Sequence, residues 1–153
     1  MSITIRTAET ADALAIARLN RLSLGYDYPK DATRENLCTI LQSPSDRVYV
    51  AVSGDEVVGY VHACAYQTLY APPMKNIMGI AVDPTRRREG IGTLLLSAVE
   101  RWAGETGAAA IRLVSGAGRT AAHQFYRSLG FDQGRDQRNF KKYLSGTSKQ
   151  EAP

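Results

Sequence analysis

The sequence predicts one domain of the mixed α/β class, with a mostly antiparallel central sheet flanked by about four helices. The chain has 153 residues, a length that supports one hydrophobic core. Two alternating apolar segments, 48–52 and 57–66, are joined by residues that favour a hairpin turn. A β-branched segment, 77–82, then runs through a loop with two glycines into a segment whose apolar residues recur at helical spacing.

The N-terminal part of the chain predicts one strand and two helices. Residues 2–6 alternate apolar and polar side chains, as a half-buried strand does. Thr10 is a candidate N-cap for a helix that ends before a loop at 25–30. Thr33 is a candidate N-cap for a second helix, which ends at the turn residues 43–45.

The C-terminal part predicts a second run of alternating elements. A mobile loop at 67–73 separates the hairpin from the next strand. Residues 109–114 are expected to form a strand, and 120–129 a helix that a following glycine ends. An extended stretch, 131–144, with a break at Gly134, is expected to complete the sheet.

Composition predicts a soluble globular protein. Residues 1–144 are expected to form the single domain, and 145–153 have the composition of a disordered tail. No apolar run approaches membrane-spanning length and the N-terminus lacks the layout of a signal peptide, so we expect a cytoplasmic protein without a membrane partner. Cys38 and Cys64 are too few and too isolated for a disulfide framework or a metal site, so we expect reduced, mostly buried thiols and no metal.

The charge of the chain is moderately positive. A net charge of +4 leaves room for an acidic partner. However, the basic residues do not line a continuous face with interleaved aromatics, so nucleic acid is not an expected partner. Much of the excess lies around 86–88, where an anionic ligand accounts for it.

The segment 80–96 has the features of a phosphate-binding loop. Gly90 and Gly92 allow a sharp turn and a close approach of the backbone to a ligand. The helix that follows presents unpaired N–H groups and the positive end of its dipole. Read alone, the glycines are equally consistent with a helix-entry turn, and the arginines with a solvated loop. One helical face is expected to be buried: Ile91, Leu94, Leu95, Ala98, Val99 and Trp102.

Two common phosphate motifs do not match this loop. A dinucleotide fingerprint requires a small residue where Leu95 stands, and a Walker loop requires a lysine, which is missing between Lys75 and Lys141. The pattern Arg87-x-x-Gly90-x-Gly92 instead resembles the pyrophosphate-binding segment of the GCN5-related N-acetyltransferase (GNAT) family.

A second segment strengthens the resemblance. Phe125-Tyr126-x-x-Leu129-Gly130-Phe131 is similar to the family's second signature, whose tyrosine reaches the cofactor's sulfur. The order of expected elements also matches the family over residues 4–144. The resemblance implies a GNAT-like acyl-CoA N-acyltransferase fold, in which two parallel central strands splay apart.

The resemblance also implies a cofactor, acetyl-CoA, and residues that bind it. The end of one strand would pair through its backbone with the pantetheine arm, and the glycine loop would hold the pyrophosphate. Arg119 stands at a helix start where many relatives carry asparagine. The implied cofactor-binding residues are Ile80, Ala81, Val82, Arg87, Arg88, Glu89, Gly90, Ile91, Gly92, Thr93 and Arg119.

Tyr126 is the implied general acid for the departing thiolate. A phenol with an ordinary pKa of about 10 is still protonated at neutral pH and able to donate. Backbone N–H groups near Ala81 or Val82 would polarise the carbonyl. From the helical pattern alone, Tyr126 also fits a packed core aromatic.

The general base is not evident from the resemblance. Met78 stands where many relatives carry a glutamate. His62 is the best nearby candidate, because histidine titrates near neutrality and shares a strand face with Tyr60, Cys64 and Tyr66, although a lone strand histidine is more often structural. The expected acceptor-binding residues are Tyr26, Tyr28, Tyr66 and Tyr70.

The resemblance implies an acetyl-CoA-dependent N-acetyltransferase that acts by direct attack of a primary amine of a small molecule or peptide. The alternative is a CoA-binding regulatory module without turnover, which the missing glutamate suggests and the retained Tyr126 opposes. A monomer or a homodimer is expected.

Overall fold

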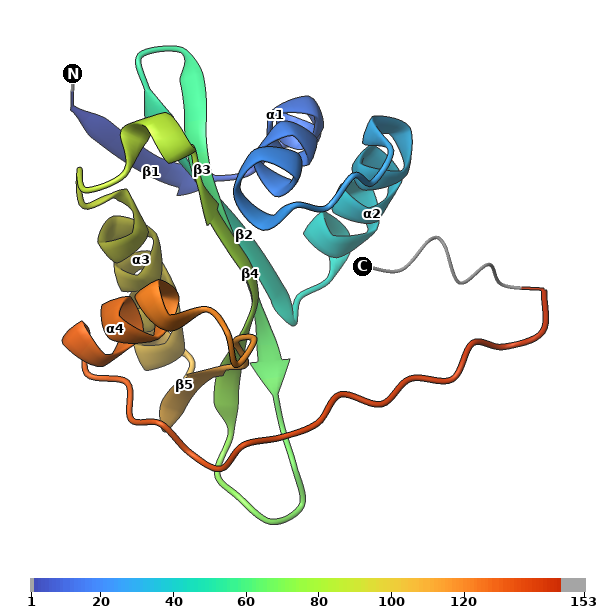
Figure 1. The fold of residues 1–153 in the computed structure, drawn as a ribbon, viewed down its shortest axis with the longest axis vertical. Coiled ribbons are helices and arrows are strands. Elements are labelled where there is room, and N and C mark those ends of the chain that lie inside the picture. Colours follow the sequence, from blue (N-terminus) through green and yellow to red (C-terminus); the bar gives the residue numbers. More distant parts are fainter. Residues whose placement is uncertain (1, 147–153) are drawn as a thin grey trace. The chain divides into compact units, whose positions relative to one another are not determined.

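The first part of the chain is built on one five-stranded sheet. The structure, a computed structural model, describes residues 2–146. The chain divides into two compact units after Leu113, and each is described by itself. In the first unit the strand order is β1-β2-β3-β4-β5 (Figure 1). The strands are β1 (Ile3–Thr7), β2 (Asp46–Ser53), β3 (Glu56–Tyr66), β4 (Met74–Val82) and β5 (Ala110–Leu113).

The sheet is mixed, as the sequence predicts. β1, β2, β3 and β4 pair antiparallel in chain order, and β5 pairs parallel to β4. The predicted hairpin is confirmed, although its strands extend further than expected, so that Gly54 and Asp55 form the turn. Gly54 has φ +62°, a left-handed conformation that glycine adopts without strain. β4 also begins earlier than expected, at Met74.

Helices cover both faces of this sheet. α1 (Ala13–Leu19) and α2 (Lys30–Gln42) lie on one side, and α3 (Ile91–Glu105) lies on the other (Figure 1). A 3₁₀ turn, η1 (Thr10–Asp12), precedes α1, and a π-helical turn, η2 (Asn20–Leu24), follows it. Gly25 then ends the helical segment with φ +77°, as expected from its position before the loop.

Neither threonine that the sequence predicts as an N-cap has that role. Glu9 precedes η1, and its N–H donates to the Asp12 carboxylate over 2.7 Å. Pro29 precedes α2, and Thr33 lies inside the helix, where its hydroxyl donates to the Pro29 carbonyl over 2.9 Å. Local sequence patterns locate a helix terminus only to within a few residues, because several nearby polar side chains are able to take the N-cap position.

The α3 side of the core is closely packed. The prediction that Leu94 is buried is wrong, because its side chain is 41 % exposed. The other residues of the expected face are buried, and so are Leu96 and Ala103. Gly59 of β3 lies directly under the first turns of α3. A Cβ there would stand 3.0 Å from Ile91 Cγ2 and 3.2 Å from Leu95 Cδ1. The first turns of α3 therefore pack directly against the backbone of β3 at Gly59.

The second unit contains α4 (Thr120–Ser128), which Leu129 and a left-handed Gly130 follow as predicted. The expected extended stretch 131–144 forms no strand within the described residues. Residues 132–139 are polar or glycine throughout, so they offer no apolar face to pack on a sheet. Residues 147–153 of the expected disordered tail lie outside the described residues, and the single domain over 1–144 stays a prediction.

Candidate active site

The second half of β4 has an open edge. β4 pairs with β5 only over residues 74–77, whereas it stays paired with β3 to its end. The register against β3 shifts between His62 and Ala63, which leaves Met78 as an extra residue on β4. Such a β-bulge bends and twists its strand. Beyond it, residues 78–82 have no ladder partner on the β5 side among the described strands.

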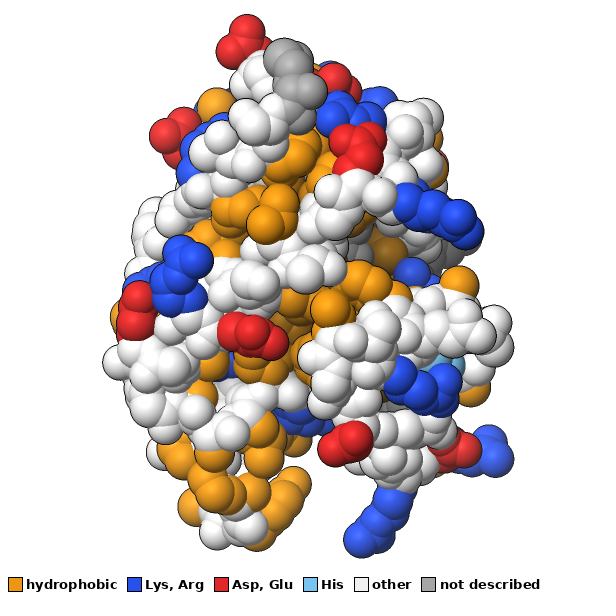
Figure 2. Space-filling model, turned by 90° about the vertical axis from the view of Figure 1, so that its left-hand side faces the viewer, with side chains coloured by type: hydrophobic (Ala, Val, Ile, Leu, Met, Phe, Trp, Pro, Cys, Tyr) orange, Lys and Arg blue, Asp and Glu red, His pale blue; other side chains and the backbone are white. Residues whose placement is uncertain are grey.

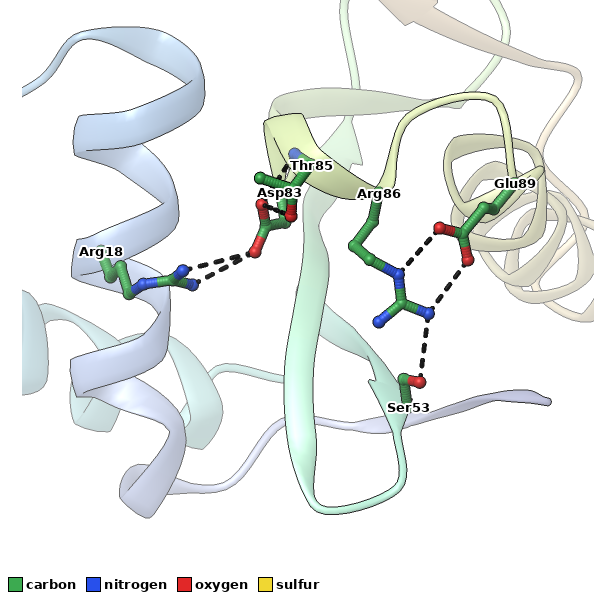
Figure 3. Close-up of polar contacts among 6 residues, drawn as sticks. All are labelled: Arg18, Ser53, Asp83, Thr85, Arg86 and Glu89. Carbon is green, nitrogen blue, oxygen red and sulfur yellow. Dashed lines mark hydrogen bonds and ion pairs between the residues drawn. The ribbon is translucent and has the colours of Figure 1, made fainter. Parts of the chain in front are cut away.

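The turn that follows β4 is fixed by Asp83, which is 2 % exposed. Its Oδ1 accepts hydrogen bonds from the Thr85 N–H at 2.9 Å and from the Thr85 hydroxyl at 2.8 Å (Figure 3). Its Oδ2 lies 3.4 Å from the Arg18 guanidinium of α1. The Thr85 hydrogen bonds, together with the Arg18 charge, hold the pKa of Asp83 below its ordinary value. This turn is thus tied to the sheet and to α1.

Arg86 is paired inside the loop. Its guanidinium contacts the Glu89 carboxylate through two bonds of 2.8 and 3.0 Å, and it donates to Ser53 Oγ over 3.2 Å (Figure 3). The Arg86 hydrogen bond keeps the pKa of Glu89 below its ordinary value. The charge of Arg86 is therefore largely neutralised, unlike the sequence expectation, while Arg87 and Arg88 are exposed to solvent.

A row of unsatisfied backbone donors runs from this loop into α3. The first bond of the helix joins the Leu94 N–H to the Gly90 carbonyl over 3.1 Å. No backbone N–H from Arg87 to Thr93 donates to any described residue. Arg88 has φ +68° and Gly90 has φ +80°, so the backbone turns through two left-handed residues. A helix N-terminus with free N–H groups and positive side chains nearby is suited to an anion.

A cavity of about 170 Å³ lies on the opposite side of the sheet from α3, below α1, η2 and α2. Its lining is mixed, and none of the described residues that line it is acidic. The lining residues are Ile16, Asn20, Tyr28, Thr33, Asn36, Leu37, Ile40, Val48, Tyr60, His62, Met78 and Gly79. The cavity thus includes the bulge of β4, where the open edge begins.

Two hydrogen-bonded pairs place polar groups in this cavity. The Tyr60 hydroxyl donates to Asn20 Oδ1, and burial raises the pKa of Tyr60 to about 12. The His62 Nε2 atom lies 2.7 Å from Asp46 Oδ1, and the two side chains are 18 % and 19 % exposed. Tyr60 is therefore a neutral phenol at physiological pH, and His62 is held against a carboxylate.

The tyrosines predicted to bind the acceptor are not all together. Tyr28 lines the cavity, and Tyr26 lies in the same loop with its N–H bonded to the Asn20 carbonyl at 3.0 Å. Tyr66 lies elsewhere, with the Arg112 guanidinium 4.2 Å from its ring centre. Tyr70 is 85 % exposed in the loop after β3 and does not line the cavity.

Tyr126 and Arg119 both belong to the second unit. The Tyr126 ring packs against Phe125 and Phe131, with centroid separations of 5.5 and 5.8 Å. Burial raises the pKa of Tyr126, and the Arg119 charge opposes this only in part. The hydroxyl therefore keeps its proton at neutral pH. Arg119 stands at the N-cap position of α4.

Asn20 and Asp46, the partners of the two cavity side chains, are not expected from the sequence. Asn20 lies at the start of η2, where its side chain reaches β3. Asp46 begins β2, two residues before Val48, the residue paired with His62. Period-two alternation places Asp46 on the face of Val48, but nothing local in the sequence gives the register that brings this face to His62.

The described residues contain neither a candidate metal-binding cluster nor a candidate membrane-spanning helix. Among residues 2–146, no group of three or more His, Cys, Asp or Glu side chains is placed to bind a metal, and no helix is long and apolar enough to cross a bilayer. Cys38 and Cys64 are unpaired and half-buried rather than mostly buried, and burial raises the pKa of the Cys64 thiol. On the face in Figure 2, basic side chains are dispersed and interspersed with acidic ones.

Comparison with known proteins gives a consistent result. A model of the acetyltransferase (GNAT) family matches residues 13–131. The aminoglycoside N(6')-acetyltransferase type 1 of Stenotrophomonas maltophilia is 31% identical over 135 residues, which cover 85% of this chain and 86% of that protein. The uncharacterized N-acetyltransferase YhfO of Bacillus subtilis (strain 168) is 30% identical over 135 residues, covering 84% and 89%.

Solved structures share the fold at lower identity. The aminoglycoside N-acetyltransferase AAC(6')-Iy, solved with the bisubstrate analogue CoA-S-monomethyl-acetylneamine, has a TM-score of 0.82 at 21% identity, over 94% of this chain and 100% of that one. A transcriptional regulator from Bacillus halodurans C-125 has a TM-score of 0.83 at 23% identity, over 92% and 100%.

Proposed function

The chain belongs to the acetyltransferase (GNAT) family and is an acetyl-CoA-dependent N-acetyltransferase, and we propose that it transfers the acetyl group to a primary amine of a small molecule by direct attack. The observation that carries this proposal is the continuity of the open β4 edge with the row of free N–H groups at the start of α3. Both belong to the same unit of the chain.

This surface fits the parts of acetyl-CoA in order. The N–H groups from Arg87 to Thr93 suit a pyrophosphate, and Arg87 and Arg88 add positive charge nearby. The open edge at residues 78–82 suits the amides of the pantetheine arm, because an extended ligand gains main-chain hydrogen bonds by adding to a free strand edge. Glu89 contributes through its backbone, since its carboxylate is bound to Arg86. We assign Arg119 a supporting contact with the cofactor.

When bound, acetyl-CoA supplies an activated acetyl thioester. We assign His62 the removal of a proton from the acceptor ammonium, so that the neutral nitrogen attacks. The backbone N–H near Ala81 or Val82 stabilises charge on the carbonyl oxygen. As the new C–N bond formed and the C–S bond broke, Tyr126 would donate its proton to the departing sulfur, and the second proton lost by the nitrogen would restore the phenol. The raised pKa of Tyr126 keeps the phenol protonated at neutral pH, which is the form that a proton donor requires.

The acceptor amine is assigned to the cavity beside Met78 and Gly79. Tyr28 and Tyr60 offer aromatic surface and hydroxyl oxygens, and His62 accepts a proton. Since none of the described lining residues is acidic, the cavity favours an amine with little additional positive charge over a polycation. Tyr26, Tyr66 and Tyr70 do not line this cavity, and we assign them to the remainder of the acceptor.

The test is release of free thiol from acetyl-CoA in the presence of different amines. The panel contains aliphatic and aromatic monoamines, a peptide with a free N-terminus, and an aminoglycoside, the acceptor class named by the relatives. We expect monoamines to be acetylated with the highest kcat/KM, and mass spectrometry to show one added acetyl group.

A pair of matched variants checks the base. His62→Gln is expected to lower turnover by about 10²–10⁴, the range for a lost general base. His123→Gln makes the same change in α4, at a histidine whose Nε2 bonds to the Gly116 carbonyl, and should leave turnover close to wild type. Thiol release that is absent with every amine would refute the proposed function.

A further inference from the structure

We propose that Asp46 is a positioning residue that holds His62 in the tautomer with its proton on Nε2, so that Nδ1 is the nitrogen that takes the proton from the acceptor amine. The inference rests on the proposed function and names how its base is oriented. Its starting point is the separation of 2.7 Å between His62 Nε2 and Asp46 Oδ1.

The chemistry of the pair fixes which nitrogen carries the proton. An ionised carboxylate has only acceptor sites, whereas a neutral imidazole has one donor nitrogen and one acceptor nitrogen. At 2.7 Å from Asp46, Nε2 must therefore be the donor when the ring is neutral. Nδ1 is then the basic nitrogen, and it has no hydrogen-bond partner among residues 2–146.

The strand ladder holds this pair in place. Val48 of β2 is opposite His62, and Asp46 is opposite Cys64, so Asp46 and His62 are diagonal neighbours on one face of the sheet. The Asp46 N–H also bonds to the Ser43 carbonyl at 3.3 Å. Since each side chain is less than one-fifth exposed, water competes little with this hydrogen bond.

The side chain that carries the free Nδ1 belongs to a residue that pairs with the start of the open β4 segment. His62 is paired across the ladder with Gly79, the residue directly after the Met78 bulge. His62, Met78 and Gly79 line the same cavity. An amine in this cavity would thus lie near both the imidazole and the start of the open β4 segment.

The first measurement is the tautomer of His62 in the ligand-free protein, read from the ¹⁵N shifts of labelled imidazoles. The chain has two histidines, so His62→Gln identifies the signals that remain as those of His123. We expect the neutral His62 ring to be a single tautomer protonated on Nε2. A mixture of tautomers, or protonation on Nδ1, would overturn the proposal.

The second measurement uses Asp46→Asn. An amide is able to donate to Nε2, so we expect a shift toward the Nδ1-protonated ring and a fall in kcat of about 10²-fold with little change in KM. The matched control is Asp55→Asn in the exposed hairpin turn, which should leave both readouts unchanged. A lower kcat without a change of tautomer would overturn the proposal, as would wild-type values of both.

These measurements separate the two claims. If no amine is acetylated, the proposed function fails, while the tautomer in the ligand-free protein still decides whether Asp46 orients the ring. If acetylation occurs and His62→Gln keeps full turnover, His62 is not the base and the inference fails while the proposed function stands.

Discussion

Gly59→Ala adds one methyl group at the point where α3 is seated on the sheet. The new Cβ would lie 3.0 Å from Ile91 Cγ2, 3.2 Å from Leu95 Cδ1 and 3.2 Å from the Ala81 carbonyl oxygen. Ordinary contacts begin near 3.4 Å, so the neighbours must move by a few tenths of an ångström. Ile91 is 2 % exposed and Leu95 is fully buried, so neither has free space in which to move.

The expected cost follows from two opposing effects. Overpacking a dense core typically costs about 1–3 kcal/mol. Replacing glycine by alanine lowers the entropy of the unfolded chain, which offsets about 0.4–1 kcal/mol. We therefore expect a net loss of about 1–2 kcal/mol in the free energy of unfolding, or a fall in Tm of about 2–8 °C for a chain of this size. Because Ile91 is the first residue of α3, acetyl-CoA affinity should fall as well.

Urea unfolding followed by fluorescence measures this loss, since Trp102 in α3 is the single tryptophan and is 4 % exposed. Gly104→Ala is the matched control in the same helix: its Cβ would meet no atom within 4 Å, and the change should stabilise by about 0.5–1 kcal/mol. If Gly59→Ala proved as stable as the wild type, the close packing of α3 on β3 would be refuted.

Four further predictions concern the cofactor site, the acid and the Asp83 turn. Acetyl-CoA at 100 times its Kd should stabilise the fold by about 2.7 kcal/mol, measured as a thermal shift. Gly92→Val should raise the Kd for acetyl-CoA by about tenfold or more. An unchanged Kd would mean that the loop does not bind the pyrophosphate. Tyr126→Phe should lower turnover by about 10²–10⁴ with little change in Tm or cofactor affinity; full turnover would assign the ring to packing alone. Because the pKa of Asp83 is lower in the folded protein than in the unfolded chain, its ionised form stabilises the fold above the ordinary aspartate pKa, and this contribution is lost as pH falls through the folded value. The midpoint in urea should therefore fall less steeply for Asp83→Asn than for the wild type between about pH 5 and pH 2, and parallel slopes would contradict the assignment.

Local chemistry in the sequence was sufficient to predict the glycine loop after β4 and the helix that follows it. Gly90 and the apolar spacing of α3 act within one or two turns of chain, so their positions in the sequence predict a sharp turn and a helix start. The hairpin from β2 to β3 was predicted for the same reason, since Gly54 favours its turn. Two short motifs in the expected order then predicted the family.

The arrangement of the cavity depended on two register shifts that no local pattern predicts. Between β2 and β3, Ser53 pairs with Glu56 but Ala51 pairs with Gly59, which leaves Val58 as an extra residue on β3. Without that bulge, Arg47 would stand opposite His62, and Asp46 would lie on the other face of the sheet.

The bulge at Met78 is likewise a register shift between two strands, and the pairing of β4 with β5 ends directly before it. A bulge is a feature of the pairing between two strands, and that pairing joins residues far apart in the chain. The sequence by itself therefore determined the glycine loop, to which we assign the phosphates, and the helix that follows it. Only the tertiary structure decided which side chains meet in the cavity proposed for the acceptor, because a shift of one residue in a strand exchanges its two faces.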